Sequence, residues 1–285
     1  MDTMISQAEE DYILENAYVP EHGLALMVSL SGGEPFLIDK RFLALKNQEW
    51  VILVGYPLGG GFSLESLVEA IEQAKKMFNP SHLSIIAPQL PDFLKEASRE
   101  REEDDYYTLD LKAYKLKSGL RRMVRKARAL LTIDISHEIT REHDEIIKEF
   151  VNRVKPLDRV KNLLFKMPQL LSHSDMAILL NAWDLRGRLT AFYAVDMQPR
   201  HFSTYVIGCH SKINYVPGAS DLLCHEMIRL SEKKGKMYIH LGLGVDQGIR
   251  KFKEKWGGKP TLRYEMCEVL LKRPSILETL QRVIG

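Results

Sequence analysis

The second half of the chain alternates apolar runs with amphipathic segments, which predicts alternating strands and helices. AILLNAWDL, the turn RG, RLTAFYAVDM and FSTYVIG have the lengths and the turn residues of three strands. Residues 220–235 place Leu and Met at helical spacing before a glycine, so we expect a helix there with Ser220 or Asp221 as its N-cap. KMYIHLGLG and LRYEMCEVLL predict two further strands.

The first half of the chain follows the same order of elements. LALMVSL, the turn SGGE and PFLIDKRFLAL predict a strand hairpin, WVILVGYPL a third strand, and SLESLVEAIEQAKKMF a helix. HLSIIAP, PDFLKEAS and YYTLDL then predict a strand, a short helix and a last strand. Ser63 precedes Ser220 by 157 residues, and Phe93 precedes Phe252 by 159. This near-constant offset indicates a tandem α/β duplication.

Two segments between the copies have helical spacing and no counterpart in the first half. They read LKAYKLKSGLRRMVRKARALL and DEIIKEFVNRVKPLDRVKNLLF. We therefore predict a shortened, supporting N-terminal unit over residues 1–111 and a fuller, active unit over residues 112–285. The acidic run EREEDD just before the first segment is predicted to be a solvated loop.

Composition limits the classes of protein that need consideration. With 285 residues, 45% hydrophobic and 27% charged, the chain can form one large domain or two modest ones. The net charge of only +2 means that any basic site is local. Three widely spaced cysteines favour a reducing cytoplasm over a disulfide framework. Because the acidic N-terminus lacks the order of a secretory signal, we expect a cytoplasmic protein that meets membranes only at their surface.

The segment from Leu111 to Arg128 is the largest local charge feature, with eight basic residues and no acidic one. On a helix, Arg121, Arg125 and Arg128 form one row, and like charges at this spacing repel unless an anion lies among them. Phosphate is the usual anion, because the planar guanidinium bonds two of its oxygens at once. The segment is therefore either a phosphate-binding helix or a solvated helix face docked on the acidic run.

The stretch GIRKFKEKWGGKP predicts a short helix that ends at Gly257. Ile249, Phe252 and Trp256 fall on one stripe of that helix, and Lys253 lies along the edge of the stripe. The remaining basic side chains, which are expected to face solvent, are Arg250, Lys251 and Lys255. An ammonium group beside an apolar stripe is either a snorkelling surface group or a cation directed at an anion.

Other motifs are too incomplete to indicate a known chemistry. YIHLGLGVDQG has the glycines of a dinucleotide loop, but too few residues follow it to complete that fold. The glycines at 59–61 lack the G-K-[ST] ending of a phosphate loop. His210, His225 and His240 do not form H-E-x-x-H, and no G-x-S-x-G is present. We therefore expect neither a metal site nor a serine hydrolase.

The motifs of the second half resemble the GNAT superfamily, especially the FemABX-like aminoacyltransferases and the lysyl-phosphatidylglycerol synthase type of domain. The resemblance rests on GLRRMVRKA, on YVPGASDLLCHEMIRLSEKKG, and on LGLG followed by GIRKFKEKWGG. The last segment is similar to the family pattern of a strand, LG and F-K-x-x-F-G, with Trp256 at the second Phe. The likeness covers residues 106–270. It implies an α/β (α+β) fold of two tandem GNAT-like units, each a mixed, mostly antiparallel sheet flanked by helices.

The resemblance also implies a reaction, the transfer of an activated acyl or aminoacyl group to an amine. Acyl-CoA or aminoacyl-tRNA would be the co-substrate, with no tightly bound cofactor. The F-K pair falls on Phe252 and Lys253, and the resemblance implies that this lysine stabilises the oxyanion of the tetrahedral intermediate. The CoA-binding pattern R/Q-x-x-G-x-G/A is absent from residues 214–220. Tyr205 and Tyr215 are candidates for the general base, or are packing residues.

The candidate phosphate-binding residues lie at two places in the second half, the basic helix and the start of the later helix. They are Arg121, Arg122, Arg125, Lys126, Gly218, Ala219 and Ser220, with Phe252 beside the substrate. The expected partner is a phosphate-bearing co-substrate: CoA, tRNA or a nucleotide-linked acceptor. Two other hypotheses stay open. One is a catalytically inactive GNAT-like scaffold that binds such a ligand, and the other is a lipid-modifying enzyme at the membrane surface.

Overall fold

The computed structural model describes residues 5–271 and divides into two compact units. The first unit comprises residues up to Asp105 together with those from Leu262 onward, and Tyr106–Thr261 form the second. Strands β5 (Glu100–Asp110) and β11 (Lys259–Leu270) carry residues of both units. No helix among the described residues is both long and apolar enough to cross a membrane.

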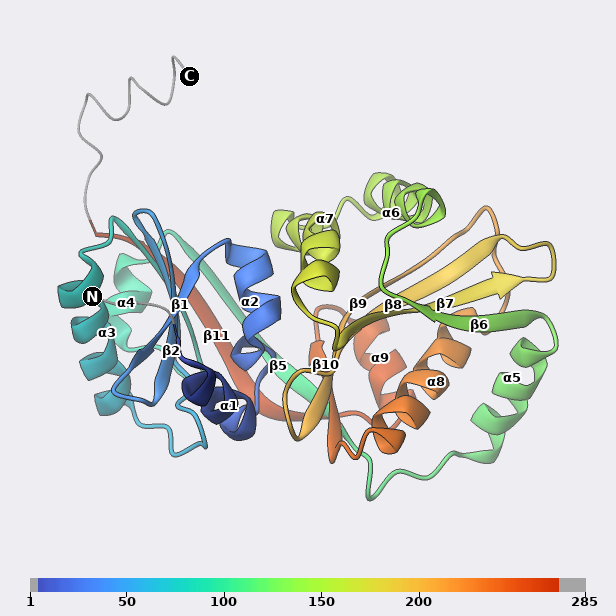
Figure 1. The fold of residues 1–285 in the computed structure, drawn as a ribbon, viewed down its shortest axis with the longest axis horizontal. Helices are drawn as coiled ribbons and strands as arrows, with labels where there is room; N and C mark the ends of the chain where they lie inside the picture. The colour runs from blue at the N-terminus through green and yellow to red at the C-terminus, as the bar shows by residue number, and fades with distance from the viewer. Residues whose placement is uncertain (1–4, 272–285) are drawn as a thin grey trace, which may run out of the picture. The chain divides into compact units, whose positions relative to one another are not determined.

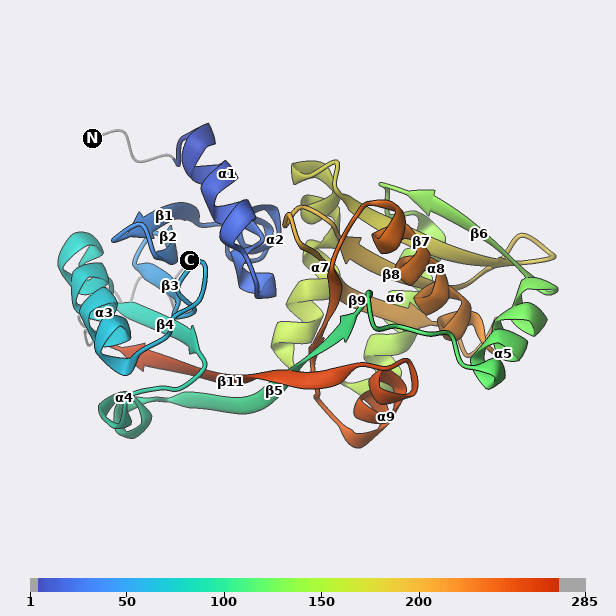
Figure 2. The same ribbon diagram turned by 90° about the horizontal axis from the view of Figure 1, so that it is seen from below.

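The first unit is a sheet with the strand order β1-β2-β3-β4-β11. Helices α3 and α4 cover one of its faces, and α1 and α2 lie on the other (Figures 1 and 2). Its elements before β5 are α1 (Gln7–Asn16), α2 (Leu24–Ser31), β1 (Glu34–Ile38), β2 (Phe42–Asn47), β3 (Trp50–Val54), α3 (Leu64–Phe78), β4 (His82–Ala87) and α4 (Asp92–Ala97). β1, β2 and β3 are antiparallel neighbours, and β3 and β4 run parallel.

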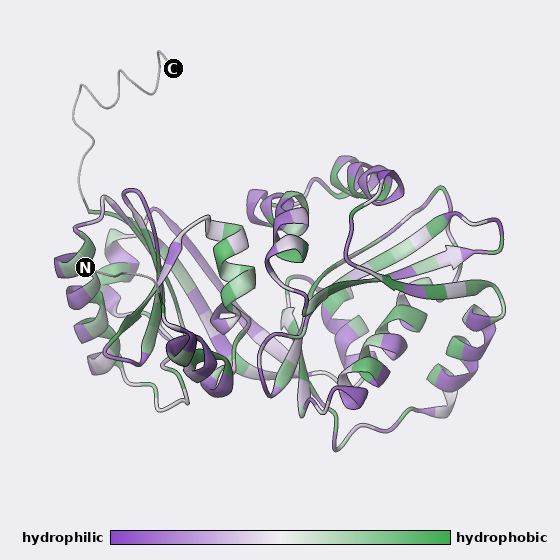
Figure 3. Cartoon of the chain, viewed as in Figure 1, coloured by the Kyte–Doolittle hydropathy of each residue, from purple (hydrophilic) through white to green (hydrophobic). Residues whose placement is uncertain are grey.

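Three sequence predictions for the first unit are wrong. PFLIDKRFLAL, predicted as one strand of a hairpin with LALMVSL, itself forms the antiparallel hairpin of β1 and β2. LALMVSL, predicted as a strand, forms helix α2, which ends at Gly32 with φ of 63°. Apart from Ser29 this run is apolar, and α2 is mostly green in Figure 3, so neither a helical nor a strand period can be read from it. EREEDD, predicted as a solvated loop, lies in β5. There Glu103 pairs with Arg101 and Arg263, which neutralises part of its charge.

The second unit is a sheet with the strand order β5-β10-β9-β8-β7-β6. Helices α6 and α7 cover one face, and α5, α8 and α9 cover the other (Figure 1). Its elements after β5 are α5 (Ser118–Arg128), β6 (Leu131–Ser136), α6 (Arg141–Val154), α7 (Asp158–His173), β7 (Ala177–Asp184), β8 (Leu189–Asp196), β9 (Phe202–His210), α8 (Ala219–Lys233), β10 (Tyr238–Leu243) and α9 (Gln247–Lys255).

The predicted duplication of elements is confirmed. A hairpin, a strand, a helix, a strand, a helix and a strand follow one another as β1-β2-β3-α3-β4-α4-β5 and again as β7-β8-β9-α8-β10-α9-β11. Ser63, whose offset from Ser220 indicated the duplication, is the N-cap of α3 and accepts a hydrogen bond from the Ser66 amide. In α8, by contrast, the predicted N-cap of Ser220 or Asp221 is wrong. Gly218 occupies that position with φ of 83° and no side-chain cap.

The basic segment is helical over only part of its predicted length. α5 begins at Ser118, so Lys112 and Lys115 lie in the connection after β5. The sequence that follows α5 is a strand, β6, which the prediction missed. α5 buries Leu120, Val124 and Ala127, which pack in one core with residues of α8 and α9.

Candidate functional site

Two parallel strands of the second unit separate partway along their length. β9 and β10 pair at Phe202 with Tyr238, at Ser203 with Ile239, and finally at Thr204 with His240. β9 then continues to His210 and β10 to Leu243, without further pairing to each other among the described residues. Beyond this point the facing edges of β9 and β10 no longer pair with each other, so we take this opening as the candidate site.

Helix α9 follows β10 directly and brings one cation to this opening. Asp246 caps the helix by accepting a hydrogen bond from the Ile249 amide at 2.8 Å. Trp256 is buried and Phe252 half-buried, but Ile249, predicted to share their stripe, is 38% exposed. Lys253, predicted at the edge of the stripe, is only 5% exposed. Removing an ammonium group from water costs free energy unless a partner compensates its charge.

The Lys253 ammonium is held at the point where the strands part. It donates a hydrogen bond to the carbonyl of Leu243, the last residue of β10, and lies 5.6 Å from the ring centre of Tyr107. A Cβ placed on Gly242 would stand 3.9 Å from this nitrogen and 3.9 Å from the Tyr205 carbonyl oxygen of β9. Gly242 has φ of 74°, which other residues adopt only with strain. Lys253 therefore faces both strands of the opening.

A second lysine of α9 has a structural partner. Lys255, predicted to face solvent, instead forms an ion pair with Asp221 of α8 at 2.5 Å, so that prediction is wrong. The same carboxylate oxygen accepts a hydrogen bond from the indole nitrogen of Trp256 at 2.9 Å. Asp221 thus ties the end of α9 to α8, which fixes the helix that carries Lys253.

The two candidate tyrosines have different surroundings. The ring of Tyr205 meets that of Tyr193 edge-on at 4.9 Å, and burial raises the pKa of Tyr205, which therefore keeps its proton at neutral pH. Tyr215 is 55% exposed and lies beside the ammonium of Lys212 and the ring of His210. Tyr205 lies at the opening through its backbone, whereas the contacts of Tyr215 are in the loop before α8.

The predicted phosphate-binding residues come from two helices that touch. A Cβ at Gly218 would stand 3.2 Å from the Cβ of Ala127, which places the start of α8 against the end of α5. All four of the candidate basic residues of α5 are exposed: Arg121, Arg122, Arg125 and Lys126. Ala219 is buried and Ser220 half-buried in the first turn of α8. The third arginine of the predicted row, Arg128, forms an ion pair with Glu226 of α8. Glu103 of the acidic run forms an ion pair with Arg263 of β11.

No family model matches this chain, and no curated protein matches its sequence. Solved structures do match it. L-PGS from Bacillus licheniformis is 15% identical with a TM-score of 0.57, over 99% of this chain and 98% of that chain. FemX is 11% identical with a TM-score of 0.61, over 93% and 97%. A tandem GNAT protein from the clavulanic acid biosynthesis pathway is 10% identical with a TM-score of 0.52, over 93% and 94%.

This chain has the tandem GNAT fold. The predicted fold class is therefore confirmed over nearly the whole chain. At identities of 10–15% the likeness establishes the fold, and the chemistry has to come from the side chains of this chain. Within residues 5–271 no group of three or more His, Cys, Asp or Glu side chains is placed to hold a metal ion.

A buried polar row, which sequence reasoning missed, crosses the second GNAT unit at the base of the opening. Asp196 of β8 pairs in register with Thr204 of β9, and Thr204 with His240 of β10. All three are at most 2% exposed. One atom of each, Asp196 Oδ2, Thr204 Oγ1 and His240 Nε2, has no hydrogen-bond partner among the described residues. Buried polar atoms are normally paired, so this row has capacity for water or a substrate group.

The charge states in the row follow from its burial. Burial raises the pKa of Asp196 to about 6. Burial, with the nearby charge of Lys253, lowers the pKa of His240 to about 3, so its ring stays neutral at pH 7. The Gly242 amide donates to His240 Nδ1 at 3.2 Å, which leaves the ring proton on Nε2. The row therefore offers a carboxylate acceptor beside hydroxyl and imidazole donors. Each member comes from a different strand, and only the cross-strand register brings the three together.

Proposed function

We propose that the second GNAT unit transfers an activated acyl or aminoacyl group to an amine and forms an amide. The observation that carries this proposal is the position of Lys253. Its ammonium is 5% exposed and lies at the separation of β9 and β10. A buried cation at such an opening is the group that acyl transfer requires, because the reaction develops negative charge on a carbonyl oxygen.

In the proposed reaction the acceptor amine attacks the carbonyl carbon of a thioester or ester. The carbonyl oxygen becomes an oxyanion, and the Lys253 ammonium donates a hydrogen bond to it. The bond from carbon to the leaving sulfur or oxygen then breaks, the carbonyl reforms as an amide, and the amine proton passes to the leaving group or to solvent. A positioned donor of this kind contributes a factor of about 10²–10³ to turnover.

The donor is proposed to be acyl-CoA or aminoacyl-tRNA, held by its phosphates. Arg121 and Arg125 are exposed on α5. The N-cap of α8 is Gly218, so no side chain accepts hydrogen bonds from the amides of its first turn. Exposed guanidinium groups beside uncapped backbone amides form a site suited to phosphate. Tyr205 and Tyr215 stay candidates for contacts with the acceptor, although the raised pKa of Tyr205 argues against it as the base.

A second candidate function is a catalytically inactive scaffold that binds a phosphate-bearing ligand. One observation favours it: the Lys253 ammonium already donates to the Leu243 carbonyl, so part of its bonding capacity is used within the fold. In this case the basic residues of α5 would bind ligand and Lys253 would serve only to hold α9 against β10.

The two functions are separated by one set of variants in the full-length protein. Donors are first selected by thermal shift, since a bound ligand raises the melting temperature by mass action. Amide products of CoA thioesters and aminoacyl-tRNAs with amine acceptors are then measured by mass spectrometry. Lys253→Ala is expected to lower turnover by about 10²–10³, whereas Lys251→Ala, an exposed lysine of the same helix, leaves it unchanged.

Unchanged turnover in Lys253→Ala, with the melting temperature preserved, would contradict the catalytic role. If no donor is turned over, yet Arg121→Glu with Arg125→Glu abolishes donor binding, the scaffold is the function. In that outcome Lys253→Ala binds the donor as tightly as the unaltered protein does.

A further inference from the structure

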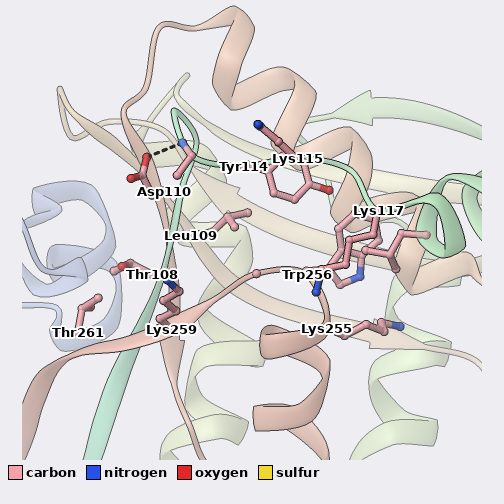
Figure 4. A pocket seen from close by; sticks show the side chains of 13 residues that line it. Thr108, Leu109, Asp110, Tyr114, Lys115, Lys117, Lys255, Trp256, Lys259 and Thr261 are labelled. Carbon is pink, nitrogen blue, oxygen red and sulfur yellow. Dashed lines mark hydrogen bonds between the residues drawn. The ribbon is translucent and has the colours of Figure 1, made fainter.

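Away from the opening between β9 and β10, the second unit has a hollow at the C-terminal end of α9. It has a volume of about 490 Å³, within the range of small-molecule sites. Figure 4 shows its walls: Thr108, Lys259 and Thr261 on one side, and Tyr114, Lys117, Trp256 and Lys255 on the other. They come from β5, the connection to α5, the end of α9 and the start of β11.

The lining of the hollow contains four lysines and one acidic residue, so its net charge is positive. Lys255 is paired with Asp221, but the side chains of Lys115, Lys117 and Lys259 form no ion pair within the described residues. Asp110 is the acidic residue of the lining, and its carboxylate accepts from the backbone amides of residues 112 and 113 at 2.8 and 3.2 Å. Three exposed ammonium groups therefore surround the hollow without a partner of their own.

The uncharged polar groups of the wall are also donors. The Tyr114 hydroxyl is buried and has no hydrogen-bond partner among residues 5–271. Burial raises the pKa of Tyr114, so this hydroxyl keeps its proton. Lys117 is the N-cap of α5 and Leu120 lies in its first turn, and this helix start carries no side-chain cap. The first amides of an uncapped helix are free donors at the positive end of its dipole.

We propose that this hollow binds a compact phosphate group, such as a phosphomonoester or pyrophosphate, through Lys115, Lys117, Lys259 and the Tyr114 hydroxyl. Apart from the Asp110 carboxylate, which accepts from backbone amides, the charged groups of the wall are ammonium donors, and the ligand that matches them is an anion with several acceptor oxygens. The site is separate from the exposed arginines of α5 and from Lys253, and it exists whether or not the unit catalyses transfer. The phosphate belongs either to a free small molecule or to a lipid headgroup.

The test measures pyrophosphate binding to the full-length protein by calorimetry. Lys115→Ala with Lys117→Ala is expected to weaken binding by more than about tenfold, and Tyr114→Phe, which removes a single oxygen, by about five- to tenfold. Lys112→Ala is the matched control, because Lys112 is exposed in the same connection but does not line the hollow. It should bind pyrophosphate within about twofold of the unaltered protein.

A second arm distinguishes the two sources of the phosphate. Vesicles of phosphatidylcholine with and without phosphatidic acid are sedimented with the same variants. Binding to phosphatidic acid that Tyr114→Phe and the double lysine variant both lose assigns the hollow to a lipid headgroup. Loss of pyrophosphate binding alone assigns it to a free phosphate compound. The proposal is overturned if Lys112→Ala weakens binding as much as the double variant, or if neither ligand binds saturably to a protein whose melting temperature is normal.

Discussion

The two units use the same order of elements but treat their parallel strand pair differently. In the first unit, β3 pairs with β4 along all its residues, from Trp50 with His82 to Val54 with Ile86. The Gly55 amide extends the pairing to the Ile86 carbonyl, and a Cβ at Gly55 would collide with Leu67 and Ala87. In the second unit the equivalent pairing ends at Thr204 and His240. The pair β3–β4 stays joined and is packed against apolar side chains, whereas β9 and β10 separate next to buried polar side chains.

The short helices α4 and α9 make the difference sharper. The offset that aligns Phe93 with Phe252 also aligns Leu94 with Lys253. Both side chains are buried, at 2% and 5% exposure. Leu94 packs in the apolar core of the first unit, while Lys253 places its ammonium at the opening of the second. A fold that fills this position with leucine in one copy does not need a charge there for stability, and this supports the catalytic role proposed for Lys253.

The largest expected effect comes from Leu94→Lys, which places the charge of the second unit into the closed first unit. Leu94 packs in an apolar cluster beside a parallel pair that stays joined, so the variant is expected to lose about 3–5 kcal/mol of unfolding free energy, the range for an uncompensated buried charge. Urea unfolding followed by circular dichroism measures the loss. Phe93→Lys is the control, since Phe93 is exposed on the same helix. Equal stability of the two variants would show that the first unit also accommodates a cation.

The reverse exchange, Lys253→Leu, closes the second unit in the manner of the first. We expect transfer to fall by about 10²–10³ in kcat/KM, equivalent to about 3–4 kcal/mol. Stability is expected to be kept or raised, because a buried charge is replaced by an apolar group of similar size. Turnover and melting temperature are measured for the same variant, and they check the expected loss of activity and the expected stability. A large loss of stability in Lys253→Leu would instead assign the lysine to structure through its bond to the Leu243 carbonyl.

Gly242 tests the backbone of the opening. Gly242→Ala forces an alanine into φ of 74°, with an expected cost of about 1–2 kcal/mol, and shifts the carbonyl and amide groups around Lys253. Gly187→Ala is a close match, because Gly187 has φ of 72° in the β7–β8 turn and a Cβ there meets nothing within 4 Å. Both variants should lose similar stability, but only Gly242→Ala should lower transfer, by about tenfold. Equal activities would remove Gly242 from the site.

The amphipathic helices were predicted well, because a helix buried on one face has apolar residues at helical spacing in its sequence. α3, α8 and α9 lie where the spacing of leucines, methionines and aromatic residues placed them. The failures have physical causes. α2 is mostly apolar and has no clear polar face, and in β5 the acidic Glu103 lies on a strand where Arg263 compensates its charge. β6 was missed because the predicted basic helix ran to Leu131, the first residue of the strand, and no element was predicted for the residues after it.

Only part of the candidate site could be predicted from the sequence. Lys253 was singled out by its position at the edge of a stripe, which is a local property of one helix, and by the F-K pair of the family pattern. The row of Asp196, Thr204 and His240 was not found, because it depends on the register of three strands that are distant in sequence. Likewise Lys115 and Lys259 are far apart in the chain, and only the fold brings them to one hollow.

The smallest effect, a pH dependence, compares one buried histidine from each unit. His22 is fully bonded, since Nδ1 accepts from the Tyr18 amide and Nε2 contacts the Tyr56 carbonyl, whereas His240 Nε2 has no partner within residues 5–271. Burial lowers the pKa of His22 to about 4 and that of His240 to about 3. Both folded pKa values lie below the unfolded value of about 6.5, so stability is complete above that pH and falls as the pH drops toward 4.

Each histidine is expected to contribute about 1 kcal/mol of that loss between pH 6 and pH 5. His240→Phe and His22→Phe should each remove one such contribution, measured as the slope of unfolding free energy against pH. At pH 7 the two variants should differ, because His22→Phe leaves two backbone groups without their partner and His240→Phe only the Gly242 amide. If His240→Phe proves the more destabilising at pH 7, its Nε2 is bonded in solution, and the row is a structural network rather than free capacity for a substrate.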